Sequence, residues 1–241
     1  MLDFSIICPV YKMNDNLCEK FLIEYCINLL GQTNKNFEII VSDQSEGDTF
    51  KNICDTFSYK LNINFIKNIF GAKIAANNVN NAIKHAKGNL VKILFVDDFF
   101  VDSKALDKIK VAFEQNKDKN WLIAGYTHTN YEVTSFFNHK LPRYNELHVL
   151  GDNSTGTPSN YTVRRNCALE MDENLMWIVD GEYFYRSYYH YGMPIMLDDI
   201  VVCFREHKDS KFLDESYRAL DGKERAYCLE KYKNEIVHRL I

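Results

Sequence analysis

The sequence NLVKILFVDDFFVD, residues 89–102, decides the fold of this chain. Its first half is an almost unbroken apolar run, which is typical of a strand buried on both faces of a parallel sheet. Asp97 and Asp98 follow this run, and we expect both at an exposed strand end. Open α/β sheets bind ligands at the carboxyl ends of their strands, and adjacent carboxylates suit a divalent cation that holds phosphates. A plain turn in which Asp98 caps the next helix is the alternative.

Strand and helix patterns alternate before this stretch. Short apolar runs predict strands, and apolar residues that recur three and four positions apart predict helices between them. The predicted strands are 4–10, 37–41 and 61–65, and the predicted helices follow the caps Asn14 and Asp15, then Asp48, and then Gly71. Such alternation implies right-handed crossovers. We therefore predict an α/β fold, a single Rossmann-like domain with a mostly parallel central sheet flanked by helices.

The pattern is less regular after the central stretch. A helix begins near Ser103, and periodicity weakens over residues 127–159, where we expect strands and loops that line a cleft. The other predicted elements are strands at 121–126, 160–163, 195–197 and 200–204, a helix capped by Asp180 that stops at Gly192, and a charged helical tail with Leu220, Tyr227, Leu229, Tyr232, Ile236 and Leu240 as its apolar residues. We expect most aromatic residues of the Asp180 helix to lie in the core.

The composition disfavours several classes of function. The 241 residues are 46% hydrophobic, and a net charge of -4 gives no basic field for nucleic acid. Seven scattered cysteines never occur as CxxC pairs, so they predict buried thiols in a reducing cytoplasm and neither disulfides nor a zinc cluster. The amino terminus lacks a basic leader, and every apolar run is too short to span a membrane. We expect a cytoplasmic protein with at most peripheral membrane contact.

Five segments together resemble the family-2 glycosyltransferases, which have the nucleotide-diphospho-sugar transferase fold of the GT-A type. FSIICPVYK resembles the first strand and nucleotide loop of that family, and FEIIVSDQSEGD resembles its second strand. NVNNAIKHAKGNLVKILFVDD resembles the helix and strand before the metal-binding acids. DENLMWIVDGEYFYR resembles the segment with the catalytic acid, and VVCFREHKDS a later Arg-x-His segment near the diphosphate. The resemblance implies a glycosyltransferase domain at 1–212 with a helical tail, 213–241, packed on it.

The resemblance also implies which residues bind the sugar nucleotide. Tyr11 would cover the nucleobase, Asp43 would accept a hydrogen bond from it, and Lys73 would supply a positive charge near the donor. The implied nucleotide-sugar-binding residues are Pro9, Val10, Tyr11, Asp43, Lys73, Asn80 and Asp97. From the residues alone, each of the first four is as well explained by a strand end, a half-buried tyrosine or a turn.

A metal ion and a base complete the implied site. The implied ligands of Mn²⁺ or Mg²⁺ are Asp97, Asp98 and His207, and the ion would neutralise the departing diphosphate. Asp180 would take the proton of an acceptor hydroxyl as it attacks the anomeric carbon, so the product would be inverted. The implied reaction moves a sugar from a nucleotide-diphosphate sugar, with UDP favoured, to a saccharide or glycolipid. Without the resemblance, Asp180 is an ordinary N-cap and His207 an ordinary surface histidine.

Three positions depart from the family pattern. Phe95 replaces the first acid that the family often has, Val179 replaces a glutamate before the catalytic acid, and Val79 replaces an arginine. These departures leave open a catalytically inactive module that binds sugar nucleotides. A nucleotidyltransferase on a related fold is the other alternative, but it would need a glycine-rich basic loop, and PVYKMNDN lacks the glycines. Retention of Asp180 favours an enzyme, because a module that only binds has no need of a base.

Overall fold

The computed structural model describes residues 1–151, 153–210 and 215–234. Its strands are β1 (Phe4–Val10), β2 (Phe37–Asp43), β3 (Ile63–Lys67), β4 (Leu90–Ile93), β5 (Phe99–Phe100), β6 (Trp121–Thr129), β7 (Phe136–Lys140), β8 (Tyr161–Arg164) and β9 (Ile195–Arg205). Its helices are α1 (Leu17–Leu30), α2 (Thr49–Phe57), α3 (Ala75–Ile83), α4 (Ala105–Gln115), α5 (Val179–Tyr191), α6 (Glu215–Arg218) and α7 (Asp221–Lys231). Short 3-10 turns are η1 (Asn14–Asn16), η2 (Glu146–Leu150), η3 (Pro158–Asn160) and η4 (Arg165–Cys167). The predicted α/β single domain is confirmed.

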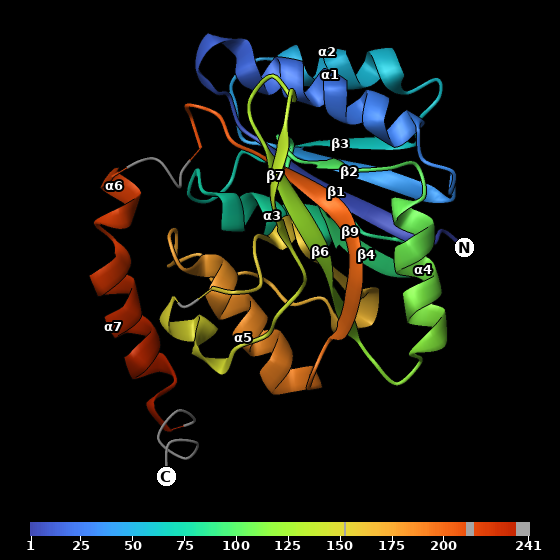
Figure 1. Ribbon diagram of the computed structural model, residues 1–241. Helices are drawn as coiled ribbons and strands as arrows, with labels where there is room; N and C mark the ends of the chain where they lie inside the picture. Colours follow the sequence, from blue (N-terminus) through green and yellow to red (C-terminus); the bar gives the residue numbers. More distant parts are fainter. Residues whose placement is uncertain (152, 211–214, 235–241) are drawn as a thin grey trace.

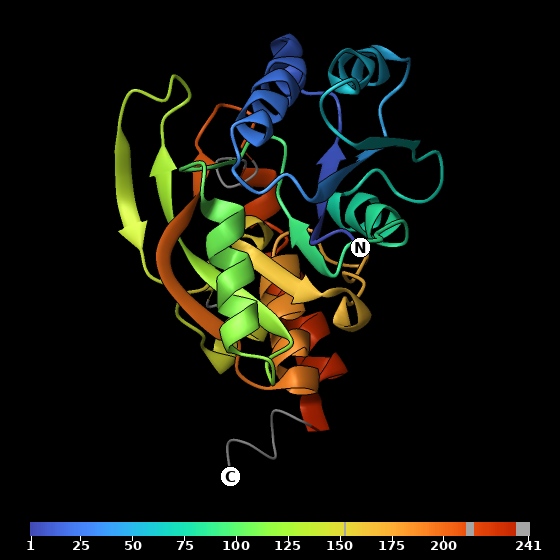
Figure 2. The same cartoon turned by 90° about the vertical axis from the view of Figure 1, so that its right-hand side faces the viewer.

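The sheet separates two hydrophobic layers. Helices α1, α2 and α4 pack on one face, and α3 and α5 pack on the other, where α7 lies outside α5 and η2 (Figures 1 and 2). Successive side chains of a strand point to opposite faces, so Ile6 of β1 lies in the first layer and Ile7 in the second. Burial on both faces explains why β1 and β4 are mostly apolar, with Ser5 and Lys92 as the exceptions.

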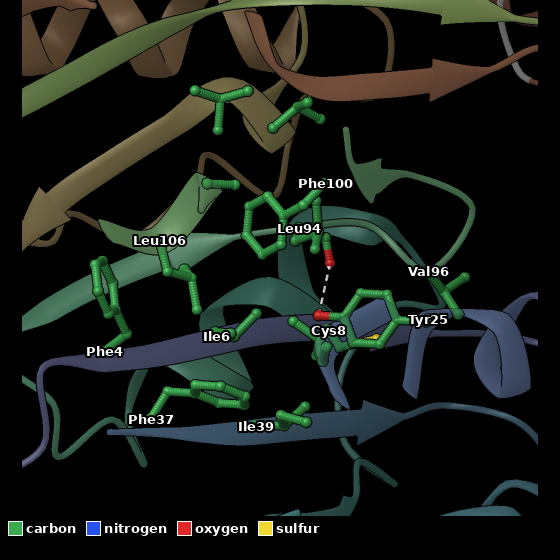
Figure 3. Close-up of a cluster of buried hydrophobic side chains, with 14 of the residues drawn as sticks. Phe4, Ile6, Cys8, Tyr25, Phe37, Ile39, Leu94, Val96, Phe100 and Leu106 are labelled. Carbon is green, nitrogen blue, oxygen red and sulfur yellow. Dashed lines mark hydrogen bonds between the residues drawn. The ribbon is translucent and has the colours of Figure 1, made fainter. Parts of the chain in front are cut away.

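The first layer closes around β1 and the end of β4. Figure 3 shows Tyr25 of α1 pointing into this layer, where its hydroxyl donates to the Leu94 carbonyl (3.4 Å). Cys8 of β1 lies beside it in the same cluster. All seven cysteines are free and buried, as the sequence predicts. Because Tyr25 holds Leu94, helix α1 fixes the chain just before the two acids.

The first half of the sheet is parallel. β1 pairs in parallel with β2 and with β4, and β2 pairs in parallel with β3. Pro9 lies in β1, a strand with neighbours on both sides, although proline has no N–H to donate. The pairing with β4 ends at Ile7 and Ile93, so Pro9 falls beyond the last β4 partner. The carboxyl ends of these strands therefore meet at one edge, as the alternating pattern predicts.

The second half of the sheet is mixed. The strand order is β3-β2-β1-β4-β8-β6-β9-β5, with β7 paired to β6. β8 is antiparallel to both β4 and β6, whereas β6 and β9 are parallel. β5 pairs antiparallel with β9 at the far edge of the sheet, and β7 pairs antiparallel with β6 beyond the residues that pair with β8. The residues after 127, where periodicity weakens, form β7 and the irregular segment that leads to β8.

β9 is one strand, where the sequence predicts two. Leu197 pairs with Ala124 and Ile200 pairs with Gly125, so Asp198 and Asp199 form a bulge between them. A Cβ on Gly125 would lie 2.8 Å from the Asp199 carbonyl, so the bulge requires glycine there. The bulge keeps β9 paired along β6 as far as Arg205, which brings the following residues to the edge that carries Asp97.

Some predicted ends of elements differ from the structure. Asn14 and Asp15 lie in η1 and not at a helix cap, and the Asp48 side chain does not cap α2. The predicted boundary at 212–213 and the apolar positions Ile236 and Leu240 lie outside the described residues. Across the described ranges, none of the helices is long and apolar enough to cross a membrane.

Candidate active site

The chain turns where β4 ends. The Phe95 N–H donates to Ser159 Oγ (2.9 Å) and leaves the sheet, so the strand stops at Ile93 although the apolar run continues. The Asp98 N–H then donates to the Phe95 carbonyl (3.0 Å), which closes a turn. Asp97 and Asp98 leave this turn into different surroundings, and only one of them lies beside His207.

Asp97 and His207 form a pair at this edge of the sheet. The Asp97 Oδ2 lies 3.0 Å from His207 Nε2, and the Asp97 side chain keeps 25% of its surface exposed. The His207 ring is buried and packs on Phe21 of α1, with 5.0 Å between ring centroids. Its Nδ1 has no hydrogen-bond partner among the described residues. His207 is therefore a fixed, buried imidazole and not the surface histidine of the alternative reading.

Asp98 occupies the interior. Its carboxylate accepts the Arg205 N–H (3.3 Å), and only 7% of the residue is exposed. Burial, and then the charge of Asp97, raise the pKa of the Asp98 carboxyl well above its ordinary value. Asp98 and Arg205 line a hollow of about 250 Å³ under α1. The expectation that both acids lie at an exposed strand end is therefore wrong for Asp98.

Lys92 is a buried charge next to this turn. Its ammonium donates to the Ser159 carbonyl and to the Tyr161 carbonyl (3.4 Å), and it is fully buried. Burial lowers the pKa of Lys92 to about 7, which the charge of Asp98 partly opposes. In the sequence Lys92 was only an interruption of the apolar run. In the structure, its hydrogen bonds connect β4 to η3 and β8. Ser159 of η3 also accepts the Phe95 N–H and so stabilises the turn that carries Asp97 and Asp98.

The predicted metal ligands assemble only in part. Among residues 1–151, 153–210 and 215–234, no three His, Cys, Asp or Glu side chains are grouped to hold a metal ion. The predicted set of Asp97, Asp98 and His207 is therefore not brought together, because Asp98 is turned inward. Asp97 and His207 do fit an ion whose remaining ligands are phosphate oxygens and water. One carboxylate and one imidazole are common ligands of Mn²⁺, and Mg²⁺ also binds through one or two carboxylates plus phosphates.

The predicted nucleotide loop follows β1. Pro9 and Val10 are buried, whereas Tyr11 is 47% exposed and presents its ring to solvent. The ammonium of Lys73, which is exposed, lies 5.9 Å from the centre of that ring. Tyr11 and Lys73 are 62 positions apart in the sequence, yet they lie side by side on the surface beyond β1. An exposed aromatic ring can stack on a flat ring system, and an exposed ammonium can pair with an anion.

Asp43 is less accessible than its predicted role requires. It ends β2, and its side chain is fully buried under Lys67, whose ammonium lies 2.7 Å from Oδ2. Its other oxygen accepts the Ser45 N–H (2.8 Å). In the structure Asp43 therefore stabilises the loop after β2. Its partner Lys67, 24 positions later in the sequence, has one third of its side-chain surface exposed. Direct contact with a nucleobase would require Lys67 to move.

Asn80 also has a structural task. It is buried in α3 and donates to the Met171 carbonyl (2.9 Å) and to Glu173 Oε1 (3.0 Å). Its oxygen accepts the Met171 N–H (2.6 Å). Asn77, one turn earlier, donates to the same Glu173 (2.9 Å). Asn80 therefore ties α3 to the segment that leads into α5, and its burial does not favour direct contact with a donor.

Asp180 lies at the start of α5. The helix begins at Val179 and Ile178 occupies the N-cap position, so Asp180 is in the first turn and is not the predicted cap. Its side chain is half-buried. The next residue, Gly181, packs directly on the His148 carbonyl in η2, and a Cβ would collide with that oxygen. This contact fixes the first turn of α5, where the helix dipole favours an ionised carboxylate.

A sequence model described as Glycosyl transferase family 2 matches residues 5–170. The chain belongs to glycosyl transferase family 2. Asp97, Tyr11 and Lys73 lie within the matched range, whereas Asp180 and His207 lie beyond it. The glycosyltransferase GlyG of Streptococcus pneumoniae is 27% identical over 128 residues, which cover 53% of this chain and 40% of GlyG. The matched segment thus spans less than half of that relative.

Solved structures share the fold of this family 2 chain. TarS 1-349 of S. aureus in complex with UDP-GlcNAc has a TM-score of 0.70 and 19% identity, over 87% of this chain and 60% of that one. The mannosyltransferase PcManGT of Pyrobaculum calidifontis, in complex with GDP-Man and Mn²⁺, has a TM-score of 0.65 and 13% identity, over 92% and 62%. At such identities these likenesses show the fold alone.

Glu182, one residue after Gly181, has a buried structural role in this family 2 member that the sequence did not predict. It is fully buried and pairs with Arg186 on the next turn (2.7 Å) and with Lys231 of α7 (2.7 Å). The hydroxyl of Tyr232 donates to it as well. Most of the aromatic set lies in the core, as predicted: Tyr183, Phe184 and Tyr185 are buried, Tyr188 and Tyr191 pack against the same cluster, and Tyr189 is exposed. The signal in the sequence was Glu182 and Arg186 at helical spacing of four.

Proposed function

We propose that this family 2 member is an inverting glycosyltransferase that moves a sugar from a nucleotide-diphosphate sugar to an acceptor hydroxyl. A UDP-sugar is the favoured donor, and a saccharide or glycolipid is the acceptor. The observation that carries the proposal is the Asp97–His207 pair at the edge of the sheet, 3.0 Å between Oδ2 and Nε2. This pair and the Tyr11–Lys73 loop both follow the carboxyl ends of parallel strands, where such sheets bind nucleotides.

The roles of the donor-binding residues follow from their surroundings. Tyr11 stacks on the base with its exposed ring, and Lys73 offers its ammonium to the diphosphate. Asp97 would be the principal metal ligand because it is exposed, and His207 would be the second. A bound Mn²⁺ or Mg²⁺ would neutralise the charge on the departing diphosphate. The solved complexes of TarS with UDP-GlcNAc and of PcManGT with GDP-Man and Mn²⁺ support this choice of ligands.

Asp180 is the residue that acts on the acceptor. As general base it takes the proton of the acceptor hydroxyl while that oxygen attacks the anomeric carbon. Attack from the face opposite the diphosphate inverts the configuration of that carbon. Glu182, two residues further, is not available for this task because it is buried against Arg186 and Lys231. The helix start and the half-buried position of Asp180 support its assignment.

A thermal-shift panel tests donor recognition. UDP-GlcNAc, UDP-glucose, GDP-mannose and TDP-glucose are each added with Mn²⁺ or with EDTA, because a ligand that binds only the folded state raises the unfolding temperature. At about 100 times Kd, the stabilisation of about 2.7 kcal/mol corresponds to roughly 5–10 °C for a chain of this size. We expect such a shift with a UDP-sugar and Mn²⁺, and a smaller one with EDTA. A panel without any shift, or a shift that EDTA leaves unchanged, would contradict the proposal.

A further inference from the structure

Helix α7 makes a polar contact with the segment that carries Asp180. The residues of α7 that contact the rest of the chain recur three and four positions apart, at 221, 224, 225, 228 and 231, which places them on one side of the helix. Figures 1 and 2 show α7 beside α5 in both views. The apolar part of this contact is small, with Cys228 and Tyr232 as its buried members. Of the predicted apolar residues, Tyr232 is buried as expected, whereas Tyr227 and Leu229 are 37% and 46% exposed.

Glu224 is the centre of this contact. It is buried, and its carboxylate accepts three successive backbone N–H groups, those of Met176 (2.9 Å), Trp177 (3.0 Å) and Ile178 (3.0 Å). Consecutive N–H groups of this kind form an anion-binding concavity. Ile178 is the N-cap position of α5, and its apolar side chain cannot accept a hydrogen bond. A residue 46 positions downstream therefore supplies the anion at the start of this helix.

The same helix also holds the chain on the other side of Asp180. Lys231 reaches Glu182 Oε1 (2.7 Å), and the Tyr232 hydroxyl donates to the same oxygen. Before Asp180, the indole of Trp177 donates to Asp221 Oδ1 (3.1 Å) at the beginning of α7. Residues 176–178 and residue 182 are thus each fixed by α7. Asp180 lies between the two fixed points.

We propose that α7 positions the catalytic carboxylate, and that Glu224 is its principal positioning residue. This proposal rests on the proposed role of Asp180 as the base. Both Asp180 and α7 lie beyond the residues matched by the family model, 5–170. Glu224 acts on the backbone of 176–178 and not on the donor, so its loss should slow transfer and leave donor binding unchanged. Displacing a reacting group by about 1 Å costs up to about a hundredfold in rate.

Four variants test the proposal in the full chain. Glu224→Gln keeps the shape of the side chain but directs an NH₂ group at backbone N–H groups. Glu230→Gln is the matched control, because Glu230 lies on the same helix with a side chain that is 76% exposed. The other two are Asp180→Asn and the double variant with Glu224→Gln. For each, turnover with a working acceptor and Kd for the UDP-sugar with Mn²⁺ are measured.

We expect Glu224→Gln to lower kcat by about tenfold or more, with Kd within about twofold of the parent, and Glu230→Gln to resemble the parent. In the Asp180→Asn background, Glu224→Gln should lower kcat little further. The base is already missing there, so its displacement has no additional effect on the rate. Parental kcat in Glu224→Gln, an equal loss in both backgrounds, or an equal loss in Kd would each overturn the positioning role. If Asp180→Asn itself keeps parental turnover, the proposed base is wrong, which is a separate outcome.

Hydrogen exchange gives a readout that does not depend on activity. The amides of 176–178 should exchange faster in Glu224→Gln and at the parental rate in Glu230→Gln, because only the first variant replaces one of their two acceptor oxygens with an NH₂ group. Unchanged exchange at these amides would overturn the proposal. If Glu224→Gln does not fold, Lys231→Met takes its place, because it removes the ion pairs of Lys231 with Glu182 and Asp172. We again expect a lower kcat with an unchanged Kd.

Discussion

Asp97 and His207 are 110 residues apart in the sequence, and their Oδ2 and Nε2 atoms lie 3.0 Å apart. The turn after β4 supplies the acid, and the segment after β9 supplies the imidazole. The bulge at Asp198 and Asp199 keeps β9 paired with β6 up to this point. The pair therefore depends on both halves of the sheet, the parallel half and the mixed half.

The Asp97–His207 pair leads to a prediction about metal-dependent binding of the donor. Asp97→Asn should weaken the Mn²⁺-dependent binding of a UDP-sugar by at least about tenfold, because the principal charged ligand is lost. Binding is measured by titration with Mn²⁺ and with EDTA. Asp102→Asn is the control, since Asp102 pairs with Lys108 on the surface (2.8 Å). Equal donor affinity in Asp97→Asn and the parent, with metal present, would show that the metal site lies elsewhere.

Asp98 makes a different prediction. Its buried carboxyl is the acceptor for the Arg205 N–H, so Asp98→Ala leaves a buried donor unpaired. The free energy of unfolding should fall by about 1–3 kcal/mol in urea titrations. Asp118→Ala, at an exposed turn, should change it by less than about 0.5 kcal/mol. Undiminished stability of Asp98→Ala would argue that this carboxyl is not part of the packed interior.

The contrast between Asp97 and Asp98 shows which features of the site could be predicted from the sequence. Apolar runs predicted β1, β2 and the strand before the acids, because burial on both faces leaves a local pattern. The resemblance to family 2 implied that Asp97, Asp98 and His207 lie together, and the structure pairs the first with the last. The inward turn of Asp98 was not predictable, since it depends on Ser159, which holds the Phe95 N–H from 64 positions away. Similarly, Lys67 covers Asp43 from another strand.

The contact of α7 with residues 176–178 could not be predicted from the sequence either. The sequence predicted an apolar face on the tail, of which Tyr232 is buried, but the contact is made mainly by Glu224, Lys231 and other polar groups. The partners of Glu224 are backbone N–H groups, which have no signature in the sequence. The one available signal was the recurrence of charged residues at 221, 224, 225 and 231. Such spacing is more often a solvated face, so only the structure identifies the contact.

The docking of α7 also gives a prediction about pH. Burial opposes ionisation of Asp172, but hydrogen bonds from Lys231, the Asn174 N–H and Tyr227 outweigh it and lower the pKa of Asp172 to about 2. In the unfolded chain this carboxyl takes up its proton near its ordinary pKa, 3.8. Its contribution to stability is therefore present above about pH 4 and is lost as the pH falls toward 2.

Asp172→Asn should accordingly be less stable than the parent at pH 5, and the difference should shrink as the pH falls from about 4 to about 2. Urea unfolding at each pH measures it. Asp118→Asn is the control, since this exposed residue should show a pH profile close to that of the parent. A difference between Asp172→Asn and the parent that stays constant over this range would contradict the assigned ion pair with Lys231.

Turnover of Asp180→Asn is the most direct test of the central claim, that Asp180 at the start of α5 is the base of a sugar transfer. Asparagine keeps the size and one oxygen of the side chain, so the first turn of α5 should survive, but it cannot take a proton. General bases contribute about 10²- to 10⁴-fold, so transfer should fall by at least about a hundredfold while UDP-sugar affinity stays close to that of the parent. Turnover near the parental value, with a working acceptor and Mn²⁺, would contradict the account.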